Sequence, residues 1–205
     1  MTKREVLTIG HSNHPIEKFV ELARLHGVSA IVDVRSAPYS RFNPQFNRDA
    51  FAEALKQQGI AYVFLGRELG ARSNDRSCYD NGRVQYRRLA EMETFRSGIE
   101  QVLSGAQDLR IALMCAEKEP LECHRALLVS RALEAVGTPV THILADGGAE
   151  SHKESMKRLL KIVGLPESDL FRSQEELIEE ACAKQAERVA YADEQILQRA
   201  GGVTL

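Results

Sequence analysis

One short stretch of the chain carries most of the side chains that can do chemistry. Residues 115–125 read C-A-E-K-E-P-L-E-C-H-R and bring together two thiols, an imidazole and a guanidinium. A thiol that leaves a strand toward the start of a helix can have a lowered pKa and act as a nucleophile. We therefore take Cys115 as the candidate nucleophile and Glu117 and His124 as candidate groups for proton transfer.

The same residue types leave a metal site and a structural role open. Cys115, Cys123 and His124 are ligands of the kind that bind zinc, and a fourth ligand would come from elsewhere in the chain. Seven residues between the two cysteines are not a usual zinc spacing, so no resident cofactor is predicted. The structural alternative is that each cysteine is a small buried apolar residue.

Arg125 gives this stretch a group that can hold an anion. Its guanidinium can grip a carboxylate or a phosphate through two parallel hydrogen bonds. The alternative is that His124 or Arg125 holds the loop through hydrogen bonds to the loop carbonyls. The position at which phosphatase spacing requires an arginine is Leu121, and Glu117 and Glu119 would repel a phosphate. Arg125 is thus a candidate substrate-binding residue, although the spacing does not indicate a phosphatase.

Two further polar groups follow apolar runs nearer the start of the chain. His11 and Ser12 come directly after residues 6–9, and Asp33 and Arg35 stand in V-D-V-R. His11 and Asp33 are candidate catalytic residues, whereas Arg35 and Ser12 are candidates for substrate binding. The alternatives are structural, namely a hydrogen-bonding histidine and an ion pair that fixes the end of a strand.

The elements that would position these residues alternate along the chain. Short apolar runs predict five strands, and apolar residues at helical spacing separate them. This order predicts an α/β fold, an open and mostly parallel five-stranded sheet with helices on both faces. Right-handed crossovers then bring the carboxyl ends of the strands to one edge. The predicted strands are residues 6–9, 30–34, 60–65, 111–114 and 140–144.

A glycine and a proline at 164–166 mark the predicted domain boundary. Residues 1–164 form the predicted α/β core, and residues 165–205 form a C-terminal helical extension whose helix runs from 174 to about 197. The helix starts with acidic residues, which is favourable for the helix dipole.

Residues 66–90 interrupt the regular alternation. They contain glycine, asparagine, aspartate and six arginines, without apolar periodicity, which is typical of a lid or binding loop. Arg67 follows the third predicted strand and is a further candidate for substrate binding. The alternative is a nucleic-acid surface, in which aromatic side chains stack on bases between arginine–phosphate contacts. Those aromatic residues would be Tyr39, Phe42, Phe46, Tyr79 and Tyr86.

Composition narrows the class of protein. The 205 residues are 43% hydrophobic and 27% charged, with a formal net charge of −2 and four scattered cysteines. Residues 35–96 hold eleven Lys or Arg against seven Asp or Glu, which favours an anionic ligand in this part of the chain. There is no apolar run of membrane-spanning length and no signal-peptide pattern, so we expect a cytoplasmic protein without a membrane partner.

Three motifs together carry a family resemblance: G-H-S at 10–12, V-D-V-R-S-A-P-Y-S at 32–40, and C-x7-C-H-R at 115–125. The chain resembles family 488 of the domains of unknown function from about residue 7 to residue 143. The resemblance supports the fold and the site positions and implies no reaction. The V-D-V-R-x-x-P-Y segment is also similar to the opening of rhodanese-type sulfurtransferase domains, but here the loop after Cys115 is longer and acidic.

The sequence therefore leads to a ranked set of functions. The first is an enzyme that uses a strand-end cysteine on a small anionic ligand, nucleotide-like or a sulfur donor. The second is a nucleic-acid-binding or processing module, and the third is a Cys/His metal-binding protein. The oligomeric state does not follow from the sequence.

Overall fold

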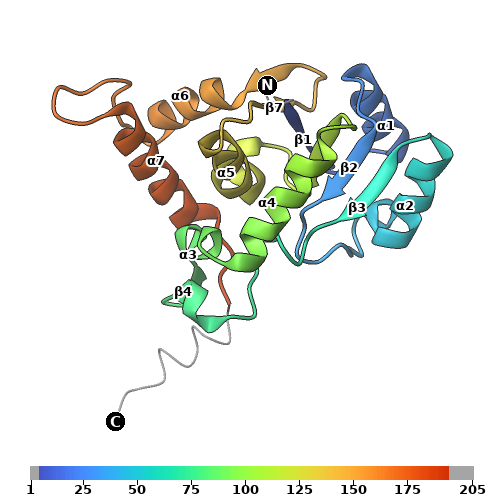
Figure 1. Ribbon diagram of the computed structural model, residues 1–205, viewed down its shortest axis with the longest axis horizontal. Coiled ribbons are helices and arrows are strands. Elements are labelled where there is room, and N and C mark those ends of the chain that lie inside the picture. Colours follow the sequence, from blue (N-terminus) through green and yellow to red (C-terminus); the bar gives the residue numbers. More distant parts are fainter. Residues whose placement is uncertain (1–4, 194–205) are drawn as a thin grey trace, which may run out of the picture.

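The computed structural model describes residues 5–193 and contains a six-stranded, mostly parallel sheet (Figure 1). The strand order is β3-β2-β6-β1-β7-β8, in which the first five strands are parallel and β8 is antiparallel to β7. This confirms the predicted α/β class, with one strand more than the five predicted. The strands are β1 (Val6–Gly10), β2 (Ala30–Asp33), β3 (Ala61–Phe64), β6 (Ile111–Cys115), β7 (Val140–Ile143) and β8 (Ala149–Ser151).

Both faces of this sheet are covered by helices, as predicted. Alternate residues of a strand point to opposite faces, and this divides β1 and β6 between two apolar clusters. Leu7, Ile9 and Met114 pack with α1 (Ile16–Leu25) and α2 (Arg48–Gln57) on one face. The opposite face is covered by α4 (Glu93–Gly105) and by the helical segment after β6. Since β1 and β6 are buried on both sides, their ends are held firmly in place.

Residues 66–90 are more regular than predicted. They contain a two-stranded hairpin, β4 (Tyr79–Asp80) and β5 (Arg83–Val84), followed by α3 (Tyr86–Ala90). Asn81 and Gly82 turn the hairpin with positive φ angles of 45° and 73°. Asn-Gly is a strong hairpin signal, but strands of two residues are too short to show a pattern in the sequence.

The segment after β6 begins with η3 (Pro120–Glu122) and then winds into a π-helix, η4 (Arg125–Ser130), before α5 (Arg131–Ala135). The Ser130 hydroxyl donates to the Arg125 carbonyl at 2.6 Å. The predicted helix from Cys123 therefore starts slightly later and has a wider first part. π-Helical turns are rare and frequently lie at functional sites.

The C-terminal part of the described chain consists of α6 (His152–Ile162) and α7 (Gln174–Val189). The predicted helix to about residue 197 ends earlier, because the chain becomes extended and Ala192 pairs with Arg83. Residues 194–197 of that prediction lie outside the described residues. The apolar side of α7 packs against α6, and the domain boundary after residue 164 stays a prediction.

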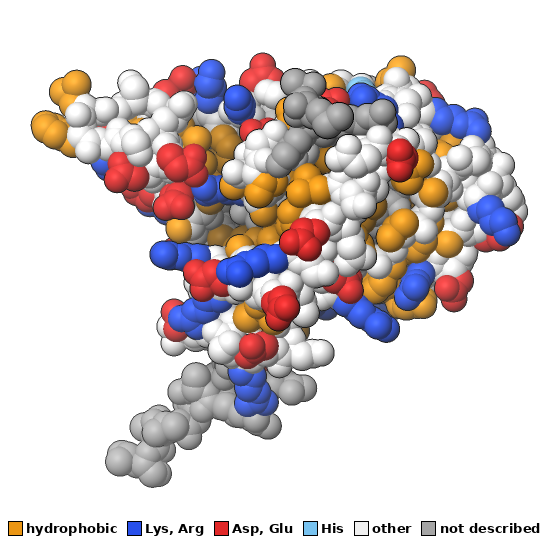
Figure 2. All heavy atoms as spheres, in the orientation of Figure 1, with side chains coloured by type: hydrophobic (Ala, Val, Ile, Leu, Met, Phe, Trp, Pro, Cys, Tyr) orange, Lys and Arg blue, Asp and Glu red, His pale blue; other side chains and the backbone are white. Residues whose placement is uncertain are grey.

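The surface shows one prominent apolar tip. Charged side chains of both signs are interspersed on the face in Figure 2, and apolar side chains gather at the far left, where the α6–α7 loop lies in Figure 1. Leu170 and Phe171 in this loop are 95% and 93% exposed. Among residues 5–193, no helix is both long and apolar enough to cross a membrane. The cytoplasmic location stays a prediction.

Candidate functional site

The carboxyl ends of β1, β2 and β6 meet at one edge of the sheet. Gly10 is in register with Cys115, and Asp33 with Met114. Backbone hydrogen bonds continue this alignment beyond the strands, since the His11 N–H donates to the Cys115 carbonyl at 2.9 Å. The chain segments that carry the predicted site residues are thus adjacent, as parallel topology requires.

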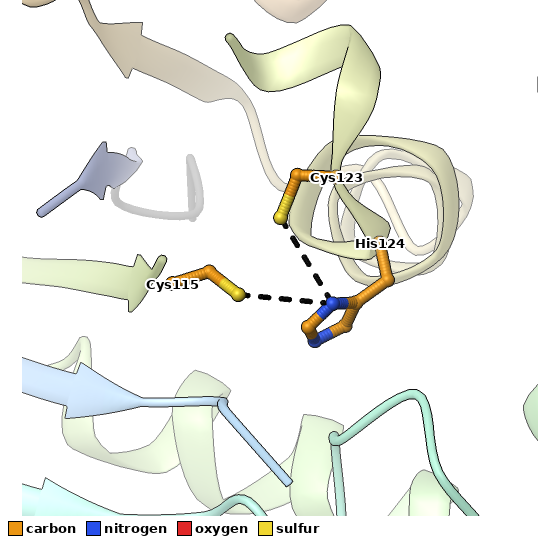
Figure 3. A group of neighbouring side chains, drawn as sticks. All are labelled: Cys115, Cys123 and His124. Atoms are coloured by element: carbon orange, nitrogen blue, oxygen red, sulfur yellow. Dashed lines mark hydrogen bonds between the residues drawn. The ribbon is translucent and has the colours of Figure 1, made fainter. Parts of the chain in front are cut away.

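Three side chains form a compact group that we call the thiol cluster: Cys115, Cys123 and His124 (Figure 3). The Nδ1 atom of His124 lies 3.8 Å from the Cys115 sulfur and 3.9 Å from the Cys123 sulfur. The Nε2 atom of the same ring donates to the Val34 carbonyl at 3.0 Å. Because a carbonyl oxygen can only accept, this bond places a proton on Nε2 and turns Nδ1 toward both thiols.

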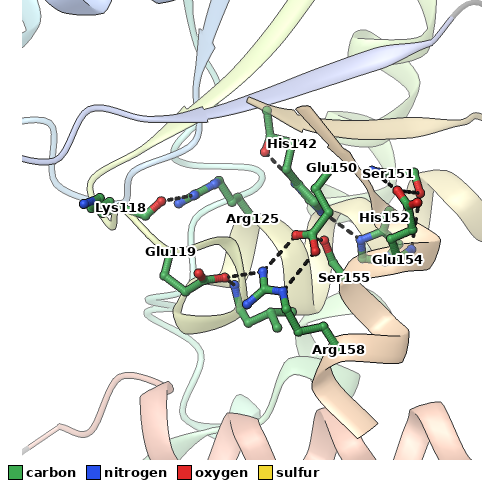
Figure 4. Close-up of polar contacts among 12 residues, drawn as sticks. Lys118, Glu119, Arg125, His142, Glu150, Ser151, His152, Glu154, Ser155 and Arg158 are labelled. Carbon is green, nitrogen blue, oxygen red and sulfur yellow. Dashed lines mark hydrogen bonds and ion pairs between the residues drawn. The ribbon is translucent and has the colours of Figure 1, made fainter. Parts of the chain in front are cut away.

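Glu117 and Arg125 complete the surroundings of Cys123. A carboxylate oxygen of Glu117 lies 3.0 Å from the Cys123 sulfur, although Glu117 as a residue is exposed. The fully buried Arg125 donates to the carbonyls of Glu117 and Lys118 at 2.6 and 3.1 Å, and its contact with Lys118 is visible in Figure 4. Its backbone N–H also donates to the Cys123 sulfur at 3.4 Å. Arg125 therefore supports the loop, and it does not line the cavity described below.

The close approach of this loop to β1 requires a glycine. A Cβ atom at Gly10 would overlap the carbonyl oxygen of Glu117 and lie 3.3 Å from Arg125. Only a residue without a side chain lets the Glu117 backbone lie directly over the end of the strand. The G-H-S motif and the C-x7-C-H-R motif are thus parts of one packing arrangement.

The protonation states of the cluster are coupled. Burial opposes ionisation of Cys123, yet the hydrogen bond from Cys115 and the positive charges of Arg125 and His124 lower the pKa of Cys123 well below its usual value. The hydrogen bond to Cys123, together with burial, raises the pKa of Cys115 well above the usual value. Burial and the neighbouring Cys123 raise the pKa of Glu117. The directions of these shifts favour ionisation of Cys123 over ionisation of Cys115.

A second polar group lies beside the first, and we call it the carboxylate cluster: His11, Asp33, Arg35 and Tyr62. The buried Asp33 accepts from Arg35 Nε at 2.9 Å, from Arg35 Nη2 at 2.7 Å and from the Tyr62 hydroxyl at 2.8 Å. Arg35 also donates to the Phe46 carbonyl at 2.8 Å and to His11 Nε2 at 3.2 Å. Each strong donor and acceptor of this cluster therefore has a partner within the protein.

His11 is held as a neutral imidazole in the carboxylate cluster. Its Nδ1 atom donates to the Ser12 carbonyl at 2.7 Å, its Nε2 atom accepts from Arg35, and its ring stacks on Phe46. Burial, followed by the charge of Arg35, lowers the pKa of His11 to about 4. At neutral pH this ring carries one proton and fixes the loop after β1.

A cavity of about 250 Å³ opens onto the thiol cluster. The predicted site residues that line it are Arg35, Cys115, Glu117 and His124, together with Cys123. The lining does not include the predicted residues His11, Ser12, Asp33, Arg67 and Arg125. Asp33 and Arg125 lie behind the wall and position its residues, whereas Arg67 is exposed. The structure thus brings four of the nine predicted site residues to the cavity, and the other five do not line it.

The lining residue Tyr191 was missed by reasoning from the sequence, whereas Tyr86 was expected in the alternative nucleic-acid surface. Tyr191 lies on the segment after α7, Arg72 is stacked over its ring at 4.4 Å, and Tyr86 borders the same cavity. The Tyr191 carbonyl accepts from the Val84 N–H at 3.0 Å, which fixes this segment against the hairpin. The contact joins residues more than a hundred positions apart, and no local pattern in the sequence signals it.

The six arginines of residues 66–90 do not act together at the cavity. Arg72 lines it, but Arg83 donates to the Ala190 carbonyl, and Arg88 donates to the carbonyls of Ser77 and Tyr79 at 2.8 Å. Arg87 forms an exposed pair with Glu91 at 3.8 Å. The predicted lid therefore supplies one cation to the cavity, and the other contacts stabilise the segment itself.

A third polar group lies away from this edge. Thr8 and His142 contact each other at 2.7 Å, and His142 contacts His152 at 3.1 Å. Beside them, Arg158 bridges Glu119 and Glu150 at 2.8 Å, and Figure 4 shows both contacts. These bonds attach α6 to the sheet and to the loop after β6, and His142 is a fully buried core residue.

The comparisons with known proteins agree with the motifs. The family model described as Domain of unknown function DUF488 matches residues 15–132, which is more than half of the chain and includes both cysteines of the thiol cluster. No curated protein and no solved structure matches the chain. The resemblance found in the sequence is thereby confirmed at the level of the family. The chain belongs to the DUF488 family of domains of unknown function.

Proposed function

We propose that this protein is an enzyme that uses a thiol of the thiol cluster as a nucleophile on a small anionic substrate. The observation that carries the proposal is the 3.0 Å contact between the Cys123 sulfur and the Glu117 carboxylate at the wall of a cavity. A nucleophile within hydrogen-bond reach of a base that can take its proton is the usual arrangement in covalent catalysis.

The sequence favoured Cys115 as the nucleophile, whereas the surroundings favour Cys123. Cys123 precedes η4, accepts from the Arg125 backbone N–H and lies beside both Glu117 and His124. Cys115 ends a buried strand, contacts His124 at 3.8 Å, and has a raised pKa because of its hydrogen bond to Cys123 and its burial. The direction of the two pKa values supports the same assignment.

The remaining residues take distinct roles in this proposal. Glu117 exchanges a proton with the Cys123 sulfur, and His124, oriented by the Val34 carbonyl, stabilises the thiolate. Arg35 and Arg72 contribute positive charge to the cavity wall and would contact an anionic substrate. His11 and Asp33 act through Arg35, because they hold its guanidinium in place.

The size of the cavity limits the substrate. At about 250 Å³ it is smaller than the pockets of about 300–1,000 Å³ that hold drug-sized ligands. Glu117 and Glu122 also line it, so that a substrate with several charges would meet repulsion as well as attraction. We therefore favour a compact sulfur-containing anion over a nucleotide.

The test of this substrate class is protection from alkylation. Small anions such as sulfate, thiosulfate and adenosine monophosphate are added while iodoacetamide labels Cys123, and the labelling rate is followed by mass spectrometry. We expect the compact anions to slow labelling, and Arg72→Ala to remove the protection. Labelling that no anion slows would contradict an anionic substrate at this cavity. The exposed Arg76→Ala variant is the matched control, because Arg76 does not line the cavity.

A metal centre is the second candidate, and a specific observation favours it. The two sulfurs and the His124 Nδ1 atom all lie within 4.8 Å of one another. In a tetrahedral zinc site the bond lengths place sulfur and nitrogen ligands about 3.6 Å apart, close to the 3.8 and 3.9 Å observed. Titration of the protein with Zn²⁺ after chelation, with Cys78→Ser as control, tests this candidate. Stoichiometric tight binding that is lost in His124→Ala would favour it over free thiol chemistry.

Nucleic-acid binding remains the third candidate. Its structural support is an exposed aromatic pair, Tyr39 and Phe42, with Arg41 stacked over the Phe42 ring at 4.8 Å. Phe46 and Tyr86, which the sequence placed in the same surface, are packed inward. Fluorescence titration with a single-stranded oligonucleotide would test it, and Phe42→Ala should weaken any binding.

A further inference from the structure

We infer that Cys115 is a resolving thiol, which closes a Cys115–Cys123 disulfide and releases a product from Cys123, and that the substrate is a small anionic disulfide. This inference rests on the proposed function and deepens it, because it names the substrate class and gives the second cysteine a role. Nothing in the family assignment supplies either.

The first support is the position of the two sulfurs. Both lie within 4.8 Å of one another and share the Nδ1 atom of His124 at nearly equal distances of 3.8 and 3.9 Å (Figure 3). Both residues line the same cavity, so that an adduct on one sulfur is formed directly beside the other. The remaining two cysteines, Cys78 and Cys182, are buried elsewhere and contact methionine sulfurs.

The second support is the way the two residues are attached. Cys115 is the last residue of β6, and Cys123 lies just before η4, so each is at the end of an element and neither is in its middle. The loop between them is held by the Arg125 guanidinium through the carbonyls of Glu117 and Lys118, and by the Ser12 N–H through the Ala116 carbonyl. The two sulfurs are thus kept near each other by elements on either side of the loop.

The presence of a second thiol beside Cys123 gives information about the class of substrate. A neighbouring thiol releases an adduct when the adduct is attached through sulfur, because thiolate attack on a disulfide sulfur is the reaction by which disulfides exchange. A substrate that Cys123 attacks at carbon or phosphorus would not need Cys115. The pair therefore indicates a substrate with an electrophilic sulfur.

The reaction has two balanced steps. The Cys123 thiolate attacks one sulfur of the substrate R–S–S–R, a bond forms between Cys123 and that sulfur, and R–S⁻ leaves with the electron pair of the broken bond. Cys115 then loses its proton to R–S⁻ and attacks the Cys123 sulfur, which expels the second R–S⁻. The two protein thiols are oxidised by two electrons, the substrate disulfide is reduced to two thiols, and no other oxidant is needed. A compact R group with a carboxylate suits the charge of Arg35 and Arg72 at the cavity wall.

The test uses dithiodiacetate, a small disulfide with two carboxylates, and the full chain in a Cys78→Ser/Cys182→Ser background. We expect the background protein to release two equivalents of mercaptoacetate and to end with an internal disulfide, seen by non-reducing peptide mapping. Cys115→Ser should release one equivalent and keep a stable adduct on Cys123. Cys123→Ser should react at least tenfold more slowly than the background.

Three other results would contradict the inference, and each would contradict a different part of it. A stable adduct on Cys123 with Cys115 present would contradict the resolving role and leave the nucleophile in place. Cys123 that is alkylated quickly by iodoacetamide but does not react with dithiodiacetate would exclude the substrate class. If Cys123 reacts with neither reagent, the proposed function fails as well. Cys115→Ala and circular dichroism show whether a loss in the serine variant comes from misfolding.

Discussion

The thiol cluster and the carboxylate cluster lie side by side at the same edge of the sheet and differ in how completely their polar groups are bonded. Asp33 and Arg35 pair at 2.7 Å and are almost fully buried, and each makes further bonds to the protein. The two thiols are equally buried, but they contact His124 only at 3.8 and 3.9 Å and border a cavity, and Cys123 has one shorter side-chain contact, with Glu117 at 3.0 Å. Strong, complete bonding fixes a structure, whereas long contacts beside open space leave a group free to react.

This difference suggests a structural role for the carboxylate cluster and a reactive role for the thiol cluster, although the two groups look alike in the sequence. Both follow buried strands, and both combine a histidine, an arginine and a carboxylate. In the carboxylate cluster the histidine accepts from the arginine, so that the group is closed on itself. In the thiol cluster the arginine holds backbone carbonyls and leaves the sulfur, the imidazole and the Glu117 carboxylate to one another. We expect the following changes to separate stability from reactivity.

The largest effect on stability should come from Arg35→Ala. This change leaves the buried Asp33 without its ion partner, and breaking a buried pair costs about 3–5 kcal/mol. Urea unfolding followed by circular dichroism measures the loss. Arg87→Ala, at an exposed pair, should change stability by no more than about 0.5 kcal/mol. An equally small effect of Arg35→Ala would show that the carboxylate cluster does not stabilise the carboxyl edge of the sheet.

The next effect is a loss of stability in acid that depends on His11. Its pKa is about 4 in the folded protein, against about 6.5 for an unfolded histidine. Below pH 6.5 the unfolded chain therefore binds a proton that the folded protein does not, so stability falls as the pH drops toward 4. The loss of stability from this one group between neutral pH and pH 4 is on the order of 3 kcal/mol. The charges that face the ring are those of Arg35, Asp33 and Arg125.

The measurement is the free energy of unfolding from pH 7.5 to pH 4.5 for the wild type and for His11→Gln. We expect a shallower slope in the variant, since the glutamine amide does not titrate. The free energy of unfolding of His11→Gln will still depend on pH, because the pKa values of His142 and His152 are also lowered by burial. Parallel curves for the two proteins would contradict a neutral, buried His11.

Gly10→Ala should affect both clusters at once. The new methyl group overlaps the Glu117 carbonyl, which is backbone and cannot move aside without shifting the loop. We expect a cost of about 1–3 kcal/mol together with slower alkylation of Cys123. Gly105→Ala is the matched control, because its methyl group meets only the end of the Ile111 side chain at 3.1 Å. If Cys123 in Gly10→Ala is alkylated as fast as in the wild type, the position of the loop does not control the reactivity of Cys123.

The smallest effect on stability belongs to Glu117→Gln, which preserves the shape of an exposed residue. We expect less than about 1 kcal/mol of change in unfolding but a different pH profile of Cys123 alkylation. The wild-type profile should show two linked ionisations, because the pKa of Glu117 is raised beside Cys123. The variant should show one. Identical profiles would mean that Glu117 does not exchange a proton with the thiol.

The fold was largely predictable because β1, β2 and β6 are buried on both faces and read as continuous apolar runs. Alternation with helices then fixed the parallel order of the core strands and the common edge. The prediction failed for β8, whose residues Ala149–Ser151 are partly polar and exposed, and for the two-residue strands of the hairpin. Short, exposed strands are set by their neighbours and leave little trace in the sequence.

The candidate site was predictable in its location and less so in its details. The ends of the strands and the cysteine motif indicated where the residues meet. The assignment of Cys123 as the candidate nucleophile depends on the Arg125 backbone N–H and on the direction of the Glu117 carboxylate, neither of which a sequence pattern encodes. The closing of the cavity by Tyr191 depends on a pairing between distant segments.

The central claim is that the thiol cluster is reactive through Cys123. The direct measurement is the rate of iodoacetamide alkylation against pH for Cys115→Ser and Cys123→Ser, both in a Cys78→Ser/Cys182→Ser background. We expect Cys123 to react at least about tenfold faster than Cys115 at pH 7, with an apparent pKa below the ~8.5 of a free thiol. If Cys115 reacts as fast as Cys123, or if the rate at Cys123 rises only near pH ~8.5, the account of this site is contradicted.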